Sequence, residues 1–146
     1  MSLAMTSAGS KIAVGLPPVG GTSLTTLQAV SYTNIAEVTD IGEFGKSYNL
    51  VTHNPLGDRV TIKRKGSINN GTIQLQMAYA PADPGQTLLA TAVDSDASYS
   101  YRVTLQDNTN FYFTGQAMGR PVQVGGVDSI TASTCNIEID STIYKA

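Results

Sequence analysis

The chain has 146 residues, which suits one domain with a sizeable core, and 41% of the residues are hydrophobic. Charged residues make up only 14%, against about 25% in typical globular proteins, and the net charge is −2 at pH 7. This balance argues against a protein that binds nucleic acid or a membrane surface through bulk positive charge.

The first 30 residues show no sustained periodicity, and prolines and glycines in residues 15–21 interrupt any helix or strand. Apolar residues such as Ile12, Val14 and Leu16 are nevertheless too frequent for a disordered tail. We therefore predict an extended arm over about 1–30 that packs on a neighbouring subunit, with packing on its own domain as the alternative. We expect neither a signal peptide nor a membrane span. We therefore expect the protein to be made and kept in a reducing cytoplasm.

Alternating residues predict the early strands. Residues 34–42 and 47–54 are expected as the first two strands, and 54–58 as a turn rich in Pro and Gly. A further alternating segment over 59–65 leads into a strand over 72–80. In that strand Ile73, Leu75, Met77 and Tyr79 are expected on one face, because successive side chains point to opposite sides of a sheet.

A single helix is predicted over about 84–94. Asp83 is placed to accept from the first free N–H groups, and Pro84 occupies the first helical position. Gln86 follows three residues after the cap, so its side chain is expected to bond back to the N–H of Asp83.

The rest of the chain returns to strand patterns. Residues 98–105 alternate, 107–110 form a hairpin turn, and the following strand ends near Met118 or Gly119. The last strands are expected over 121–124 and 130–139, where Cys135 is a small core residue. About seven strands and one helix predict a mainly β domain over residues 1–146, a β-sandwich or partly open barrel with one short flanking helix.

Chemical sites are not expected. His53 is the only histidine and no G-x-S-x-G turn accompanies it, so a hydrolytic triad is not supported. No His, Cys and carboxylate cluster has zinc spacing, and the run after Asp94 lacks the Gly and Glu of a calcium loop. We predict no catalytic residue, no metal site and no cofactor.

Charge is segregated along the chain. Four of the nine positive charges lie within seven residues, as do three of the eleven acids. Such segments could pair head-to-tail between copies and set their register, or be two exposed faces that never meet. The basic residues are Arg59, Lys63, Arg64 and Lys65; the acidic residues are Glu37, Asp40 and Glu43.

Several motifs, in this order, resemble the tail tube proteins of long, non-contractile-tailed phages of the lambda type. The central one is the run from Met77 to Leu89, a strand followed by P-x-D-x-G-Q-x-L-L. A first strand with the sequence VTDIGEFG (38–45) precedes it, and the tyrosine-bearing strand SYSYRV (98–103) follows. The element Phe113-Thr114-Gly115 and a last strand rich in Thr and Ile complete the resemblance over about 32–140.

The resemblance implies a structural virion protein that forms hexameric rings stacked into a hollow tube for genome ejection. Implied partners are further copies of the chain, a tape measure protein in the lumen, tail tip and tail terminator proteins, and double-stranded DNA that passes without sequence-specific binding. No membrane binding by this chain is implied. Assembly would take place in the cytoplasm of the host bacterium.

In that family the hairpin matching residues 46–71 reaches the next ring. The resemblance therefore makes this hairpin, the N-terminal arm and the acidic segment candidate contacts between subunits. Two alternatives stay open: the tube of a related contractile injection machine, and a small β-barrel module that binds carbohydrate or single-stranded nucleic acid. The candidate contact residues are Asn54, Leu56, Asp58, Arg59, Lys63, Arg64, Lys65, Glu37, Asp40, Glu43, Ile12, Val14 and Leu16.

Overall fold

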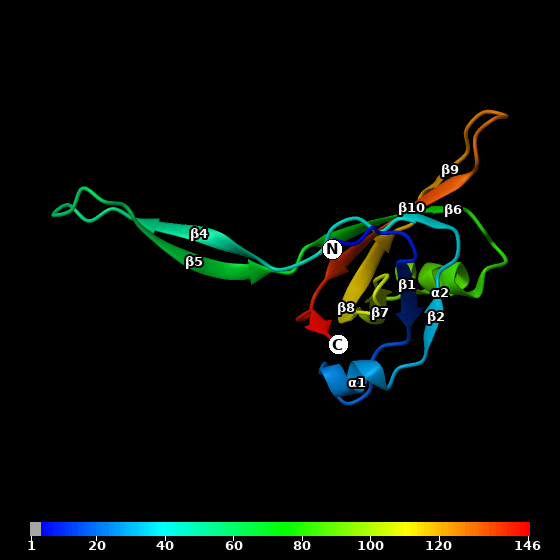
Figure 1. Ribbon diagram of the computed structural model, residues 1–146, viewed down its shortest axis with the longest axis horizontal. Coiled ribbons are helices and arrows are strands. Elements are labelled where there is room, and N and C mark those ends of the chain that lie inside the picture. The colour runs from blue at the N-terminus through cyan, green and yellow to red at the C-terminus, as the bar shows by residue number, and fades with distance from the viewer. Residues whose placement is uncertain (1–3) are drawn as a thin grey trace.

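A computed structural model describes residues 4–146, and these form eleven strands and two helices (Figure 1). The mainly β prediction is confirmed. In chain order the elements are β1 (Lys11–Gly15), α1 (Leu24–Gln28), β2 (Tyr32–Asn34), β3 (Val38–Asp40), β4 (Ser47–His53), β5 (Ile62–Asn69), β6 (Thr72–Ala78), α2 (Pro84–Val93), β7 (Tyr99–Thr104), β8 (Asn110–Gly119), β9 (Val122–Gln123), β10 (Ala132–Ile139) and β11 (Tyr144–Lys145).

The main sheet is antiparallel and curls back on itself. Its strand order is β2-β1-β7-β8-β10-β6-β3, with β9 paired to β10 and β11 paired to β8. The outermost strands, β2 and β3, are consecutive in the chain and are joined only by residues 35–37. The N–H of Ile35 donates to the oxygen of Ile12 at 3.0 Å, and the N–H of Ala78 donates to the oxygen of Glu37 at 2.8 Å. This crossing segment, residues 35–37, therefore links both edges of a partly open barrel.

The prediction of a single strand over 34–42 is wrong. The chain leaves β2 at Asn34 and re-enters the sheet at Val38, on its opposite edge. Glu37 has a φ of 61°, a left-handed conformation that ends extended backbone and turns the chain between the two strands.

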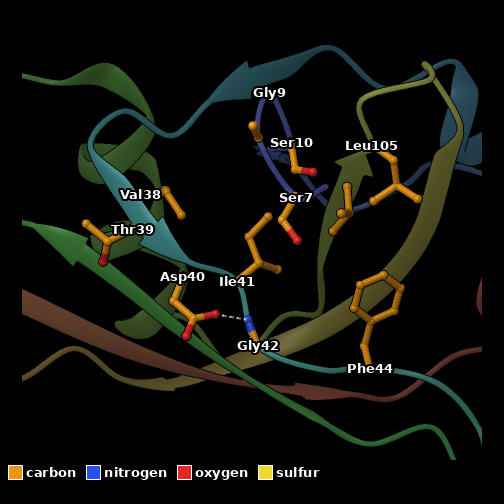
Figure 2. Close-up of a pocket in the computed structure, with 12 residues that line it drawn as sticks. Ser7, Gly9, Ser10, Val38, Thr39, Asp40, Ile41, Gly42, Phe44 and Leu105 are labelled. Atoms are coloured by element: carbon orange, nitrogen blue, oxygen red, sulfur yellow. Dashed lines mark hydrogen bonds between the residues drawn. The ribbon is translucent and has the colours of Figure 1, made fainter. Parts of the chain in front are cut away.

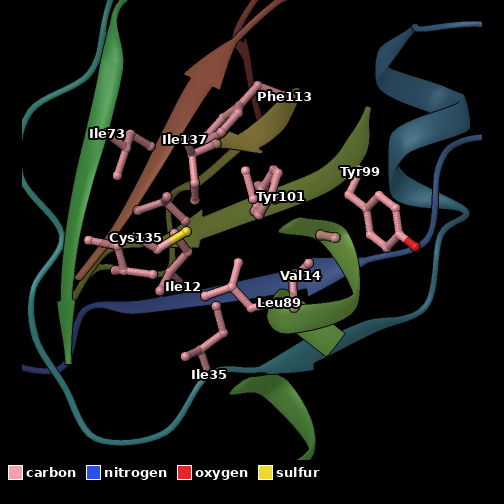
Figure 3. Close-up of a cluster of buried hydrophobic side chains, with 14 of the residues drawn as sticks. Ile12, Val14, Ile35, Ile73, Leu89, Tyr99, Tyr101, Phe113, Cys135 and Ile137 are labelled. Atoms are coloured by element: carbon pink, nitrogen blue, oxygen red, sulfur yellow. The ribbon is translucent and has the colours of Figure 1, made fainter. Parts of the chain in front are cut away.

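The barrel core contains the predicted alternating residues (Figure 3). Ile73, Leu75 and Met77 of β6 are at most 1% exposed, while Tyr79 lies beyond the strand and is 39% exposed. Cys135 is fully buried, as predicted. The alternation therefore identifies the buried face of β6 correctly and fails only where the strand ends.

Of the arm predicted over about 1–30, residues 1–3 lie outside the described residues, and strand β1 packs on its own domain, as in the alternative that the sequence left open. Strand β1 lies between β2 and β7 in the main sheet. Ile12 and Val14 are 0% exposed and belong to the core, so these two side chains have no free surface for a neighbouring subunit. Leu16 follows the strand and is 61% exposed.

Helix α2 begins as predicted but without the expected reciprocal cap. The N–H of Gln86 donates to Oδ2 of Asp83 at 3.0 Å, and Pro84 occupies the first turn. The side chain of Gln86 does not bond back to the N–H of Asp83, because it is fully buried and bonds to other groups.

That side chain connects three parts of the fold. Nε2 of Gln86 donates to the oxygens of Ala36 and Ala78, at 3.0 and 2.9 Å. Oε1 accepts from the N–H of Ala80 at 3.0 Å and from Nη2 of Arg120 at 2.8 Å. Gln86 thus joins the crossing segment, the end of β6 and the residue that follows β8.

Helix α1 was not predicted. Its capping box uses Ser23 and Thr26: the N–H of Thr26 donates to Oγ of Ser23 at 3.3 Å, and the N–H of Ser23 donates to Oγ1 of Thr26 at 2.9 Å. The usual Glu or Gln of such a box is replaced by Thr, and the helix spans only five residues, so the sequence signal was weak.

Candidate assembly surfaces

Strands β4 and β5 form a two-stranded sheet that is separate from the main sheet and projects far from the barrel (Figure 1). Every residue of β4 is exposed, and in β5 only Ile62 and Gly66 are partly covered. The protruding hairpin predicted over 46–71 is therefore present, with its pairing running from Ser47 opposite Asn69 to His53 opposite Ile62. The expected strand over 59–65 is shifted, since β5 begins at Ile62 and continues to Asn69.

The predicted basic residues lie on this hairpin and are all exposed. Lys63, Arg64 and Lys65 face Thr52, Val51 and Leu50 in register, so they occupy both faces of the ribbon. Nζ of Lys65 lies 4.7 Å from the centroid of the Tyr48 ring. Arg59, Asn54, Leu56 and Asp58 lie in the exposed connection between the two strands.

The hairpin exposes several apolar side chains, of which the sequence predicts only Leu56 as a candidate contact. The exposed fractions are 107% for Leu56 at the tip, 70% for Val60 and 41–65% for those along the strands. The sequence predicts only a strand over 47–54 and does not tell whether its apolar side chains are buried or exposed. The apolar residues along the strands are Tyr48, Leu50, Val51 and Ile68.

The predicted acidic residues lie on the barrel instead. Glu37 is in the crossing segment, Asp40 ends β3 and Glu43 follows it, and all three are exposed. Oδ1 of Asp40 accepts from the N–H of Gly42 at 2.8 Å and lines a surface pocket beside the N-terminal residues (Figure 2). The acidic and basic segments therefore occupy different parts of the molecule, the barrel and the hairpin.

A second exposed segment connects β8 to β10, where the sequence predicts only a short strand. Residues 121–130 are all exposed, and only Val122–Gln123 pair with β10, so the strand expected over 121–124 is shorter. We call residues 121–131 the apolar arm. Val124, Val127 and Ile130 are 76%, 103% and 79% exposed, and the only charge in the arm is Asp128.

A third feature is a pocket of about 370 Å³ where the hairpin joins the barrel. We call it the hairpin-base pocket. The rings of Phe44 and Phe111 meet there edge to face, with centroids 5.3 Å apart. It shares Phe44 and Leu105 with the pocket in Figure 2. The lining residues are Phe44, Gly45, Lys46, Asn70, Leu105, Phe111, Thr142 and Ile143.

The residues with catalytic potential do not come together. His53 is exposed on β4, whereas Cys135 is buried in the barrel, where burial raises the pKa of its thiol to about 11. Within residues 4–146 no group of three or more His, Cys, Asp or Glu side chains could hold a metal ion. None of the helices in this part of the chain is long and apolar enough to cross a membrane.

A module that binds carbohydrate or single-stranded nucleic acid would need exposed aromatic side chains, and Tyr99, Tyr101 and Phe113 do not supply them. Tyr99 is 7% exposed, and Tyr101 and Phe113 are 0% exposed. The rings of Tyr101 and Phe113 stack inside the core with centroids 5.8 Å apart. Burial also raises the pKa of Tyr101, and its hydroxyl has no hydrogen-bond partner.

Comparison with known proteins gives one family match and several likenesses in fold. A family model described as phage tail tube protein, TTP, matches residues 11–144. The tail tube of phage SPP1 superposes with a TM-score of 0.69 at 10% identity, over 93% of this chain and 75% of that chain. No curated protein matches the sequence significantly.

Contractile machines contain similar folds. A chain of the six-fold symmetrised baseplate of the anti-feeding prophage gives a TM-score of 0.71 at 11% identity, over 100% of this chain and 97% of that chain. The sheath/tube terminator of the extracellular contractile injection system PVC gives a TM-score of 0.69 at 8% identity, over 100% of this chain and 99% of that chain. At these identities the likeness concerns the fold.

Proposed function

Since the chain belongs to the phage tail tube protein family, we propose that it assembles into hexameric rings that stack into the hollow tail tube, the conduit for genome ejection. The role as a structural component of the virion tail follows from the family itself. The six-fold symmetry of the anti-feeding prophage baseplate, which contains the same fold, supports the ring number.

The projecting hairpin is the observation that carries the assembly proposal. A two-stranded ribbon alone in water is marginally stable, because it has no third strand or helix to cover its apolar side chains. Here the ribbon is long, leaves the barrel entirely and exposes Leu50, Leu56 and Ile68. A neighbouring subunit would cover these side chains, and the basic residues Lys63 to Lys65 would meet carboxylates on that neighbour. The exposed acids Glu37, Asp40 and Glu43 are the candidates.

The remaining partners follow from a tube of this kind. A tape measure protein would occupy the lumen during assembly in the host cytoplasm, and tail tip and terminator proteins would bind the two ends. Double-stranded DNA would pass through without sequence-specific contacts, which suits a net charge of −2. The subunit would work by geometry, with neither catalysis nor a cofactor.

A contractile injection machine is the second candidate, favoured by the likeness to the prophage baseplate and the PVC terminator. The tail type is decided by the presence of a sheath around the tube. A sheath gene beside this one and a sheath in micrographs of the virion would support the contractile reading; a bare, flexible tail would contradict it.

Negative-stain electron microscopy of the purified protein tests the assembly. We expect rings or tubes with six-fold rotational averages, at high concentration or with tail tip complex added. A protein that stays monomeric under both conditions would contradict the proposal, and an average with another symmetry would contradict the hexamer.

Charge reversal tests the role of the hairpin. Replacing Lys63, Arg64 and Lys65 together by Glu should leave the monomer folded, because all three side chains are exposed, and should block tube growth. Circular dichroism and micrographs measure the two effects. Reversing Lys145, an exposed cation that lies off both the hairpin and the N-terminal arm, is the control. Tubes of normal length from the triple variant would show that this run is not a stacking contact.

A further inference from the structure

The apolar arm and the hairpin-base pocket lie at opposite ends of the barrel. Strand β8 passes from Phe111, which lines the pocket, to Gly119, which precedes the arm. Eight residue steps along a strand span about 25 Å. Strand β6 gives the same result, since the hairpin enters it at Thr72 and Ala78 at its other end pairs with Ala132, the residue after the arm. The arm of one chain therefore cannot fill its own pocket.

The two features are complementary in chemistry. The arm offers Val124, Val127 and Ile130 to solvent at 76% exposure or more, which is costly for aliphatic side chains that nothing covers. The pocket is lined by the aromatic and aliphatic side chains of Phe44, Leu105, Phe111 and Ile143.

The charges also match. Asp128 is the only charged residue in the arm, and Lys46 is the only charged residue that lines the pocket. Both side chains are exposed, so an ion pair between two copies would fix the register of an otherwise apolar contact.

We propose that the apolar arm of one subunit docks in the hairpin-base pocket of a second copy, with Asp128 beside Lys46. This inference rests on the proposed tube. Hairpin and arm leave the barrel at opposite ends, so when hairpins point toward the next ring, the arms of that ring point back toward the hairpin bases (Figure 1). Each interface between rings is then clasped from both sides, by a hairpin in one direction and an arm in the other. The contact joins two different surfaces and so repeats along the tube.

A charge swap tests the pairing. Asp128→Lys and Lys46→Asp should each raise the critical concentration for tube formation by about tenfold or more. The double variant should bring this concentration most of the way back to the wild-type value. Sedimentation of assembled tubes measures it. Asp94→Lys reverses an exposed acid that belongs to neither surface and should have little effect. A double variant whose critical concentration is as high as that of the single variants would overturn the pairing.

Cysteine cross-linking tests the contact independently of charge. Val127→Cys with Thr142→Cys places one thiol on the arm and one at the pocket rim, while the native Cys135 is buried. Oxidised tubes should give a ladder of dimers and higher multimers on non-reducing gels, and Val127→Cys with Asp94→Cys should not. Tubes with no ladder, whose Val127→Cys thiol remains open to maleimide, would overturn this inference and leave the tube standing. Absence of tubes from the wild-type chain would overturn the proposed function instead.

Discussion

Gln86 holds the barrel closed through one side chain. It donates to the carbonyls of Ala36 and Ala78 and accepts from the N–H of Ala80, and the Gln86 side chain itself is fully buried. It also accepts from Arg120, whose Nε is buried without a partner. A polar residue in the core is here the link between two sheet edges.

Replacing Gln86 by Leu should lower the free energy of unfolding by about 3–5 kcal/mol. Each buried polar group left without a partner costs about 1–3 kcal/mol, and the change strands several of them together with a guanidinium. Urea denaturation of the monomer measures the loss. Gln74→Leu, on the exposed face of β6, should change stability by about 0.5 kcal/mol or less; similar losses in both variants would contradict the closing role.

Cys135 gives the barrel a pH dependence of known sign. Burial raises the pKa of its thiol from 9.0 to about 11, so the folded chain keeps a proton that the unfolded chain loses first. Its contribution to stability is complete below about pH 9 and is lost as the pH rises to about 11.

We expect the native thiol to resist Ellman's reagent at pH 8 and to react once per chain after unfolding. Between pH 9 and 11 the free energy of unfolding should fall less steeply in Cys135→Ala than in the wild type. Identical slopes for the two proteins would show that the thiol titrates equally in the folded and unfolded states.

At the scale of elements, α2 is fitted against the crossing segment by a glycine. A Cβ on Gly85 would lie 2.2 Å from the oxygen of Asn34 and 2.7 Å from Cα of Ile35, both main-chain atoms that cannot move aside independently. The helix therefore approaches the chain between β2 and β3 as closely as its backbone permits.

Gly85→Ala should destabilise the monomer by about 3 kcal/mol, although Ala favours a helix by about 1 kcal/mol over Gly. Thermal unfolding measures it. Gly119→Ala serves as the control, since a Cβ there has no neighbour within 4 Å. A stabilised Gly85→Ala variant would mean that α2 sits farther from the crossing segment than in this structure.

The elements show what local patterns can predict. Alternation located β6, β7 and β10 because their inner faces are apolar, and the Asp83-Pro84 pair located the start of α2. The role of Gln86 could not be inferred in the same way, since a capping box and a buried bridge require the same residue. The left-handed conformation of Glu37, which divides the predicted first strand, could not be predicted either, because the residue at this position is not a glycine.

At the scale of the whole molecule, the barrel and the hairpin are two separate sheets. The N–H of Gly45 donates to the oxygen of Asn70 at 3.3 Å, so the two ends of the hairpin meet at the barrel surface. Strands β4 and β5 pair only with each other. The order of sequence motifs identified the family, and 46–71 was recognised as protruding, but the apolar arm was missed because an exposed valine and a buried one look alike in sequence.

Replacing residues 47–69 by Asn-Gly, a turn that closes two antiparallel strands, should leave the melting temperature of the monomer within about 5 °C of the wild type. The same variant should form no tubes. Calorimetry and electron microscopy measure the two properties. A variant that no longer unfolds cooperatively would show that the hairpin belongs to the folding unit.

The pairing of β1 with β7 sets the order in which the subunit is completed. Lys11 pairs with Thr104, whereas Ser47 and Asn69 of the hairpin are close in the chain. Contacts between distant segments form slowly, because a long loop must be closed first. During synthesis the β4–β5 and β1–β2 pairs can therefore form while β7, the second partner of β1, has not yet been made. In the proposed tube, the hairpin would be complete before the barrel that carries it, so we expect a subunit to join the tube only after β7 to β11 have been made.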